Sequence, residues 1–416
     1  MAHDDAGQAD RRGFLQAAAG AAVALGAGVG PVLGQDGAAA AGAAGGALPR
    51  RKLGKTGAEV TLLNQGAVRS ESIDRIYRTA FAGGIRMFDA AKAYGNEPSF
   101  RRWFEAEPGV REQVFLVTKD EPKEPGQLVG MLDQRVETLG VKQVDLFFVH
   151  GLGDHHTTDE AIRFLKDPEF ARAADAMRKS GKARFVGFSA HHKDRAEMIK
   201  VAAQTGVVDA IMLMYSPWLD KDSELNRALD LAYEKGIGLI SMKQTAGKFL
   251  GDKPKTNILD DVKARVPALA ERKLTPFQGL LHAIWTDERI SSVCVSMRNT
   301  EQIRENVDAA RRYEPLKAAD IRALGDAVVA HRPTLCADCD GRCSSAGGTA
   351  AALGDLARFL TYHEHHGDRA EARRQFAALA PAARDWSAAD LAAARAACPL
   401  HLDFATLLAE ADRLLA

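Results

Sequence analysis

Short apolar segments alternate with longer amphipathic segments eight times along this chain, and this alternation restricts the fold more than any other feature. Apolar runs of this length predict buried strands, and they lie at residues 61–67, 87–90, 114–119, 144–150, 183–189, 210–215, 238–243 and 291–297. Segments with helical spacing of apolar residues lie between and after them, for example at residues 72–81, 127–139, 159–179, 196–204, 224–234 and 300–312. Eight such units predict an α/β fold, the (β/α)8 or TIM barrel, which needs roughly 250 residues.

A doubly wound sheet is the rival fold, and the turns argue against it. Such a sheet normally carries a Gly-rich phosphate turn after its first strand, and this sequence has none there. Gly54 and Gly57 precede the first predicted strand and lack the P-loop spacing. They predict a plain turn.

The charge balance excludes two classes of partner. The 416 residues contain 55 Lys and Arg and 55 Asp and Glu. A net charge of zero argues against a general nucleic-acid binder and against a polybasic membrane binder. Because 46% of the residues are hydrophobic and 26% are charged, the bulk of the chain is predicted to be soluble and globular.

Residues 1–48 differ in composition from the rest and predict a targeting segment and linker. Arg11 and Arg12 precede an uncharged stretch, mostly Ala, Gly and Val, that runs to Gln35. The stretch is long enough to span a bilayer, but it is poor in Leu, Ile and Phe, and its glycines lower helix stability. It resembles a twin-arginine export signal, which implies export to the periplasm by the twin-arginine machinery and no stable membrane span after cleavage. A signal anchor and a chance Arg pair before a disordered linker are the alternatives.

Four residues suited to acid–base chemistry fall at or just after the ends of three consecutive predicted strands. Asp89, Lys119 and His150 end the second, third and fourth strands, and Tyr94 lies on the loop after the second. Each has an ordinary structural explanation when taken singly: a helix cap, a solvated strand end, a core histidine and a loop aromatic. The active site of a (β/α)8 barrel lies at the carboxyl ends of its strands, so the four together predict a catalytic group.

The chemistry of this group favours proton transfer to a carbonyl oxygen. A phenol has a reference pKa near 10. The ammonium of Lys119 is expected to lower the pKa of Tyr94, and the carboxylate of Asp89 to keep that ammonium charged. His150 is able to hydrogen-bond a carbonyl oxygen and fix its position. Proton donation to that oxygen is productive if a hydride reaches the carbon, and a nicotinamide is the usual hydride source.

These segments resemble the aldo/keto reductase family over about residues 48–313. The matching pieces are Phe88-Asp89-Ala90-Ala91 with Tyr94-Gly95, then Thr118-Lys119, then residues 145–150. All four members of the family's catalytic tetrad are present and in order. The resemblance implies that Tyr94 is the general acid/base, that Asp89 and Lys119 tune it, and that His150 orients the substrate.

The resemblance also implies NADP(H) or NAD(H) as cofactor and assigns contacts on the later strands. Ser189 would hold the nicotinamide carboxamide and Tyr215 would stack on the ring. Lys243 would touch cofactor or substrate, with an added charge at the barrel mouth as the alternative. Ala190 and Met212 stand where the family often has asparagine and glutamine.

The adenosine half of the cofactor is assigned to the helix after the eighth strand. Gln302, Glu305 and Asn306 match the family there. Arg298, just before this helix, is suited to hold a 2′-phosphate, which favours NADPH over NADH. An ordinary amphipathic helix with a solvated arginine is the alternative.

The remaining residues, 316–416, predict a small helical domain beside the barrel of residues 49–315. Helical segments lie at 353–362, 388–397 and 404–415. Four of the five cysteines fall here, at Cys336, Cys339, Cys343 and Cys398. The tail resembles the ferredoxin-like extension of certain exported aldo/keto reductases, which implies one [4Fe–4S] cluster on these four thiols.

The cysteine pattern departs from that resemblance and leaves other chemistry open. Three residues separate Cys339 from Cys343, and only Cys398 is followed by proline. A structural zinc site, disulfides or a relic tail are the alternatives. The histidines at 363, 365 and 366 lack H-E-x-x-H spacing and predict a solvated helix face.

The sequence therefore predicts an exported NAD(P)H-dependent oxidoreductase that reduces an aldehyde or a ketone. The alternative is an iron–sulfur electron-transfer or nicotinamide-sensing protein without carbonyl turnover, because a soluble cofactor pool is not expected outside the cytoplasm. The predicted partners are a small carbonyl substrate, the export machinery and a redox partner, with no nucleic acid.

Overall fold

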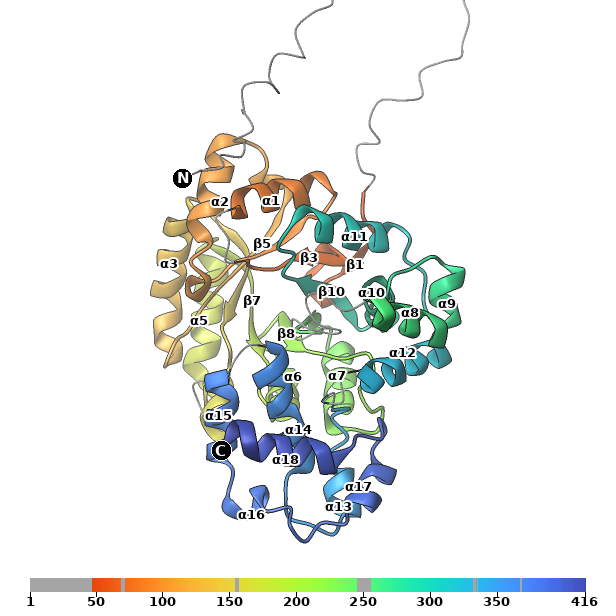
Figure 1. The fold of residues 1–416 in the computed structure, drawn as a ribbon. Coiled ribbons are helices and arrows are strands. Elements are labelled where there is room, and N and C mark those ends of the chain that lie inside the picture. The colour runs from red at the N-terminus through yellow and green to blue at the C-terminus, as the bar shows by residue number, and fades with distance from the viewer. Residues whose placement is uncertain are drawn as a thin grey trace, which may run out of the picture. The chain divides into compact units, whose positions relative to one another are not determined.

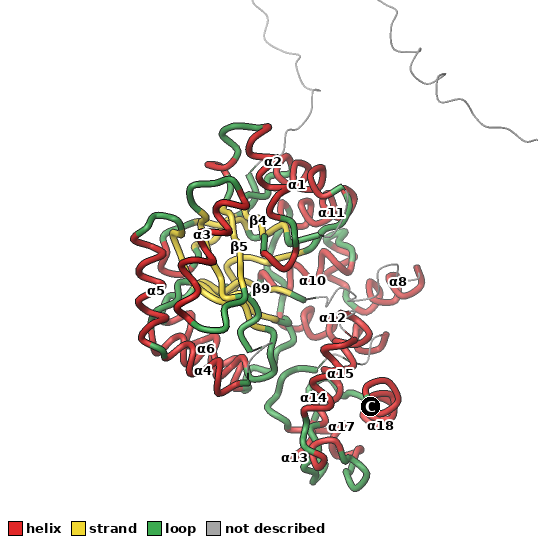
Figure 2. Tube along the Cα trace, turned by 90° about the vertical axis from the view of Figure 1, so that its left-hand side faces the viewer, coloured by secondary structure: helices red, strands yellow, loops and turns green. Residues whose placement is uncertain are grey.

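Eight parallel strands close into a barrel, as the alternation predicts. Their order around the barrel is β10-β3-β4-β5-β6-β7-β8-β9, so each strand pairs with its neighbours in the chain and β10 closes the ring on β3. The strands are β3 (Leu63–Gln65), β4 (Met87–Asp89), β5 (Phe115–Asp120), β6 (Val144–Val149), β7 (Ala183–Ala190), β8 (Ala210–Met214), β9 (Gly238–Met242) and β10 (Ile290–Val295). Figure 2 shows them in yellow inside a surround of helices.

The computed structural model describes residues 47–68, 72–153, 157–244, 256–331, 334, 336–366 and 369–416. All of them belong to one unit that spans residues 44–416. The predicted export signal at Arg11 and Arg12 lies outside the described residues.

Helices cover the outside of the barrel. They are α1 (Ile73–Ala82), α2 (Glu97–Ala106), α3 (Leu128–Leu139), α4 (Thr158–Lys166), α5 (Pro168–Lys179), α6 (Arg195–Thr205), α7 (Glu224–Glu234), α8 (Thr256–Arg265), α9 (Pro267–Glu271), α10 (Pro276–Trp285), α11 (Thr300–Arg311) and α12 (Ala318–His331). The single helical segment predicted at 159–179 forms two helices. Pro168 starts the second, and the Asp167 side chain accepts a hydrogen bond from the backbone N–H of Glu169. Proline disfavours helical geometry in the residue before it, which explains the break.

A short hairpin at the amino end of the barrel is absent from the sequence prediction. β1 (Arg50–Lys52) pairs antiparallel with β2 (Glu59–Thr61). The predicted turn lies between them and contains the 3-10 helix Gly54–Thr56. Leu53 and Val60 are buried with barrel-interior residues such as Met87, Leu146 and Ile240, so the hairpin fills that end of the barrel.

The C-terminal residues form a small helical region with its own core. Its helices are α13 (Arg342–Ala346), α14 (Leu353–Thr361), α15 (Arg369–Ala378), α16 (Pro381–Arg384), α17 (Leu391–Ala397) and α18 (Phe404–Leu415), in blue in Figure 1. The first residue of the chain that belongs to this core is Ala337. The buried residues of α12 belong instead to the barrel core, although the predicted domain boundary at 315/316 places α12 in the tail.

The expectation of a solvated helix face is wrong for His363, and the side chains of His365 and His366 lie outside the described ones. His363 is 8% exposed and lies in a π-helical turn, Tyr362–His366, so its side chain is buried and not on a solvated helix face.

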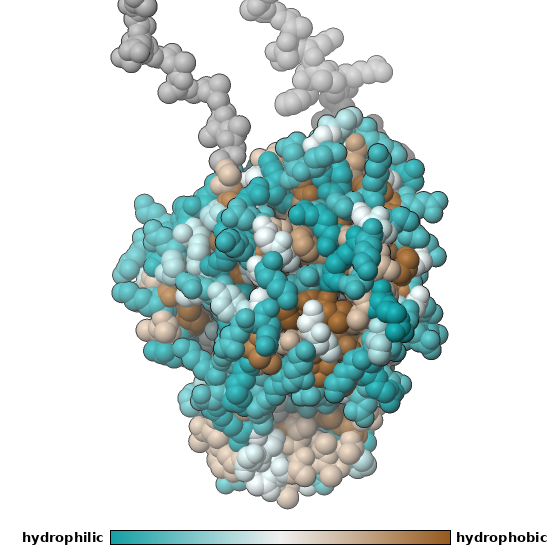
Figure 3. Space-filling model, turned by 180° about the vertical axis from the view of Figure 1, so that it is seen from behind, coloured by the Kyte–Doolittle hydropathy of each residue, from teal (hydrophilic) through white to brown (hydrophobic). Residues whose placement is uncertain are grey.

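In Figure 3 the rear face is mainly hydrophilic, and weakly apolar residues gather at its lower end, where the C-terminal helices lie. Within the part of the chain that the structure describes, no helix has both the length and the apolar character needed to cross a membrane.

Candidate active site

A buried ion pair lies inside the carboxyl end of the barrel, between β4 and β5. Side chains alternate along a strand. Phe88 packs outward against Trp103, with ring centroids 5.3 Å apart, so Asp89 faces the interior. There it binds the ammonium of Lys119, which also donates to the Ala90 carbonyl at 3.1 Å. Lys119 is fully buried and Asp89 is 3% exposed.

The ion pair keeps Lys119 charged. Burial alone would lower the pKa of Lys119, but the interactions with Asp89, Tyr94 and Cys294, that with the Asp89 carboxylate foremost, together outweigh burial and raise it. The ammonium therefore stays protonated at neutral pH, as the sequence reasoning expects.

Tyr94 and His150 complete the group above this pair. Tyr94 ends a 3-10 turn, Lys92–Tyr94, directly after β4. Its hydroxyl lies 3.2 Å from Nε2 of His150, and the Lys119 ammonium lies 5.0 Å from the centre of its ring. Nδ1 of His150 lies 3.2 Å from a carboxylate oxygen of Glu121. The structure thus brings together all four residues that the sequence analysis placed at the strand ends.

The acidity of Tyr94 differs from the sequence expectation. Burial raises the pKa of Tyr94 to about 12, and the ammonium of Lys119 opposes that rise without cancelling it. The predicted effect of Lys119 is present, but it is smaller than the effect of burial. The phenol is therefore protonated at neutral pH and is available as a proton donor.

Asn96 supports the Tyr94 turn, and the sequence analysis did not single it out. The Asn96 amide donates to the Asp89 carbonyl at 3.1 Å and to the Tyr77 hydroxyl at 2.8 Å, and it accepts from the Ala91 N–H at 3.3 Å. The bonds with Asp89 and Ala91 join the end of β4 to the start of α2, on either side of Tyr94, and the bond to Tyr77 adds α1. Its place directly after Tyr94-Gly95 was the available signal, because asparagine commonly bonds nearby backbone in turns.

Two predicted nicotinamide contacts lie on the ends of β7 and β8. Ser189 is buried, and its hydroxyl accepts a hydrogen bond from the Gly151 N–H at 3.0 Å. Tyr215 follows β8 directly and is 5% exposed, and its hydroxyl donates to Asp287 at 2.8 Å. In this position the Tyr215 ring presents little free surface for stacking.

Of the remaining predicted cofactor residues, Lys243 follows β9 and the other four lie just before α11 or within it. Lys243 is partly buried after β9, with a left-handed backbone φ of 55°. Arg298 is exposed, and its N–H donates to the Gln302 side chain at 2.8 Å. Glu305 accepts from the Thr275 hydroxyl at 2.5 Å, and Asn306 is 8% exposed. Arg298 and Gln302 are thus the more accessible members of this set.

The four tail cysteines lie near one another, and two of them, Cys343 and Cys398, belong to the small second core. All four are free thiols, and three of them are buried: Cys339, Cys343 and Cys398. Burial raises the pKa of Cys343, and the neighbouring thiols of Cys339 and Cys398 raise it further. A Cβ added to Gly354 would lie 3.5 Å from the sulfur of Cys336 and 4.0 Å from that of Cys343. Cys398, distant in sequence, therefore lies with the others.

These thiols do not form a ready-made metal-ion site. Among the described residues, no group of three or more His, Cys, Asp or Glu side chains is arranged to hold a metal ion. One feature does suit a metal-bound thiolate: the Asp338 N–H donates to the Cys336 sulfur at 3.4 Å.

A groove of about 860 Å³ lies at the amino end of the barrel, away from this group. It is lined by charged side chains that include Arg50, Arg86, Arg111, Asp145 and Arg184. Asp145 pairs with Arg111 at 3.0 Å and with Arg184 at 2.6 Å. Features at this end of a (β/α)8 barrel generally serve stability, so the candidate active site is the group at the carboxyl end.

Comparison with known proteins gives the same family as the site. A sequence profile of the aldo/keto reductase family matches residues 57–328, which excludes the four tail cysteines. The chain is similar to L-glyceraldehyde 3-phosphate reductase of Escherichia coli O157:H7, at 26% identity over 320 residues that cover 64% of this chain and 88% of that protein. It is also similar to aldo-keto reductase yakc (NADP(+)) of Schizosaccharomyces pombe, at 29% identity over 153 residues that cover 32% of this chain and 40% of that protein.

A solved structure supports the fold. Aldo-keto reductase AKR11C1 from Bacillus halodurans, in its holo form, superposes with a TM-score of 0.53 at 19% identity and covers 67% of this chain and 96% of that one. Since the family profile spans well over half of the chain and the barrel carries the site at its carboxyl end, the protein is an oxidoreductase that belongs to the aldo/keto reductase family.

Proposed function

We propose that this protein reduces an aldehyde or a ketone with NADPH, with Tyr94 as the general acid. The observation that carries the proposal is the Tyr94 hydroxyl, 3.2 Å from His150 and beside the buried Lys119–Asp89 pair. Use of NADP(H) agrees with the family in general, and the exposed Arg298 before α11 favours a 2′-phosphate.

The chain's own residues supply the proton and the orientation. A bound NADPH supplies the hydride that reaches the carbonyl carbon. The carbonyl oxygen accepts hydrogen bonds from Tyr94 and His150, and it takes the Tyr94 proton as its negative charge develops. The tyrosinate left behind is stabilised by the ammonium of Lys119, which Asp89 holds in place. The products are an alcohol and the oxidised cofactor.

Replacement of the phenol tests the proposal. Tyr94→Phe keeps the ring and removes the only atom that donates the proton. We expect kcat for carbonyl reduction to fall by about 100-fold or more. The loss of NADPH absorbance with a panel of aldehydes and ketones measures the rate. The panel includes glyceraldehyde 3-phosphate, because the similar Escherichia coli protein is named for it. Binding of NADPH, measured by fluorescence titration, should stay unchanged and serves as the control. Turnover at the wild-type rate would refute the proposal.

A second candidate function rests on the tail. The closeness of the four thiols supports a redox role, as a [4Fe–4S] protein with a redox partner or as a nicotinamide sensor without carbonyl turnover, although a cluster would require the thiols to rearrange, since the described residues form no ready-made metal-ion site. Iron and acid-labile sulfide analysis of the purified protein tests it. About four iron atoms and four sulfides per chain support the cluster, and about one zinc ion per chain supports a structural zinc site. Free thiols without iron or zinc mean that the tail holds no metal.

We further propose export to the periplasm through the twin-arginine machinery, on the strength of Arg11 and Arg12 before an uncharged stretch. Fractionation of cells that express wild-type protein or Arg11→Lys/Arg12→Lys tests this. Export of the variant at the wild-type level would contradict it.

A further inference from the structure

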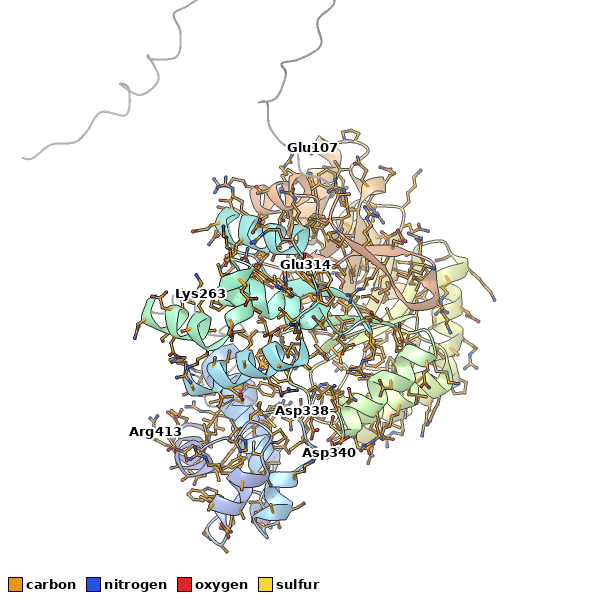
Figure 4. All side chains as sticks on the ribbon, turned by 90° about the vertical axis from the view of Figure 1, so that its right-hand side faces the viewer. Glu107, Lys263, Glu314, Asp338, Asp340 and Arg413 are labelled. Carbon is orange, nitrogen blue, oxygen red and sulfur yellow. The ribbon has the colours of Figure 1, made fainter. Side chains whose placement is uncertain are left out.

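The loop that carries three of the tail cysteines is fixed to the carboxyl end of the barrel. We call residues 336–343 the cysteine loop. Its Ala337 carbonyl accepts from the Asp220 N–H at 2.9 Å, and the Asp340 carboxylate accepts from the Glu224 N–H at the start of α7, at 2.8 Å. Arg342 pairs with Asp220 at 2.7 Å. Figure 4 shows Asp338 and Asp340 where the blue tail meets the green barrel helices.

One arginine of the barrel connects the cysteine loop to two strand ends. Arg195 begins α6 and is 2% exposed. Its guanidinium donates to the Met214 carbonyl at 3.1 Å, to the His192 carbonyl at 3.2 Å and to the Asp338 carboxylate at 2.7 Å. Met214 is the last residue of β8, and His192 lies on the loop after β7. The guanidinium therefore holds three segments together.

Asp338 is the anion that makes this arrangement stable. Its second oxygen accepts from Arg358 of α14 at 2.6 Å, so the carboxylate lies between one cation of the barrel and one of the tail. Burial alone would raise the pKa of Asp338, but Arg195 and Arg358 outweigh it and hold it below its usual range. Tyr362 of the tail adds a bond to the same barrel loop, from its hydroxyl to the His191 carbonyl at 3.1 Å.

The two strand ends held by Arg195 carry predicted nicotinamide contacts. Ser189 lies three residues before His192, and Tyr215 directly follows Met214. We propose that Asp338, acting through Arg195, is a positioning residue for the nicotinamide end of the site, so that the tail is needed to shape the barrel's cofactor contacts. This inference rests on the proposed function for its cofactor, and it does not depend on what the tail thiols hold.

Two aspartates of the cysteine loop provide a matched pair of variants. Asp338 and Asp340 both adopt left-handed backbone, with φ of 51° and 56°, and asparagine tolerates that region well. Asp338→Asn removes the charge that faces Arg195. Asp340→Asn removes a charge that faces α7 and leaves Arg195 untouched. Both variants thus place asparagine in the same backbone conformation. They differ in the partner that the lost charge faced, Arg195 for Asp338 and α7 for Asp340.

Two readouts decide the inference. We expect Asp338→Asn to raise the Kd for NADPH by about tenfold, and to speed amide hydrogen exchange in peptides that cover residues 189–195 and 212–218. Asp340→Asn should leave both at the wild-type level. Wild-type values for Asp338→Asn, or an equal effect of the two variants, would overturn the inference.

The exchange measurement separates this inference from the proposed function. A wild-type protein that binds no NADPH would refute the function, and exchange in the two peptides would still test the positioning. If Asp338→Asn does not fold, Arg195→Lys replaces it. Lysine keeps the charge beside Asp338 but has no planar fork to reach Met214, His192 and Asp338 together. Slower or unchanged exchange in that variant would contradict the positioning role.

Discussion

Replacement of Lys119 by methionine separates the structural from the catalytic role of the buried ion pair. Methionine has a similar length and no charge, so Lys119→Met leaves the Asp89 carboxylate, 3% exposed, without its cation. Breaking a buried pair by removing one partner lowers the free energy of unfolding by about 3–5 kcal/mol, because the remaining charge is buried alone. Replacing both partners is often close to neutral.

The double variant follows from the same reasoning. Asp89→Asn with Lys119→Met has no buried charge at this position, and we expect it to recover about 2–3 kcal/mol of the loss, a coupling typical of residues in direct contact. Both variants should lose about 100-fold or more in kcat, because neither has an ammonium beside the tyrosinate that forms at Tyr94. The double variant should therefore regain stability relative to Lys119→Met, while kcat stays low in both.

Guanidinium denaturation followed by far-UV circular dichroism measures the stability changes, and NADPH absorbance measures turnover. The reasoning is refuted if Lys119→Met costs less than about 1 kcal/mol, as a surface substitution would. It is also refuted if the double variant is no more stable than Lys119→Met, since Asp89 would then not be an unpaired charge in the single variant.

Three further predictions test other parts of the fold and site. Because burial raises the pKa of Tyr94 to about 12, kcat/KM for reduction should stay level from neutral pH to about pH 10, and a fall centred near pH 8 would contradict this assignment. Gly54→Ala should lower the free energy of unfolding by about 2 kcal/mol or more and leave kcat unchanged, because its φ is 52° and a Cβ would overlap the backbone of Gly236 at the amino end. The pKa of Asp338 is held low in the folded protein, so its ion pairs stabilise fully above about pH 4, the unfolded value, and are lost as the pH falls through the lower folded value. The stability difference between wild type and Asp338→Asn should therefore be constant down to about pH 4 and shrink below it; a difference that grows in acid would contradict the ion pairs.

The barrel could be predicted from sequence because its strands are buried on both faces. Such strands appear as continuous apolar runs, and all eight predicted segments overlap an observed strand. The hairpin was missed because its two strands have three residues each, too few for a periodic pattern. Pro168 did carry a signal for the break between α4 and α5, since proline prefers the first helical position.

The site was predictable where its residues lie at strand ends, and less so where it depends on packing. Asp89 and Lys119 lie at the ends of β4 and β5, and His150 directly follows β6. Closure of the barrel therefore brings these three residues together independently of the longer loops. The balance of effects on Tyr94 required its burial, which sequence spacing does not give. The Asp338–Arg195 pair joins residues 143 positions apart, and no local pattern marks either as a partner of the other.

The placement of buried charge explains why the tail is docked where it is. The carboxyl end of the barrel contains an interior ion pair, Lys119–Asp89, and a second buried cation, Arg195, near the ends of β7 and β8. The first pair is complete within the barrel. Arg195 bonds two carbonyl groups there, and its carboxylate partner in the structure, Asp338, comes from the tail. With the tail in place Arg195 is 2% exposed, and a buried guanidinium without an anion is strongly destabilising, so the docked tail has to bring an anion with it, and Asp338 is that anion. The C-terminal extension therefore supplies the anion for a guanidinium that joins the end of β8 to the loop after β7, next to two of the predicted cofactor contacts.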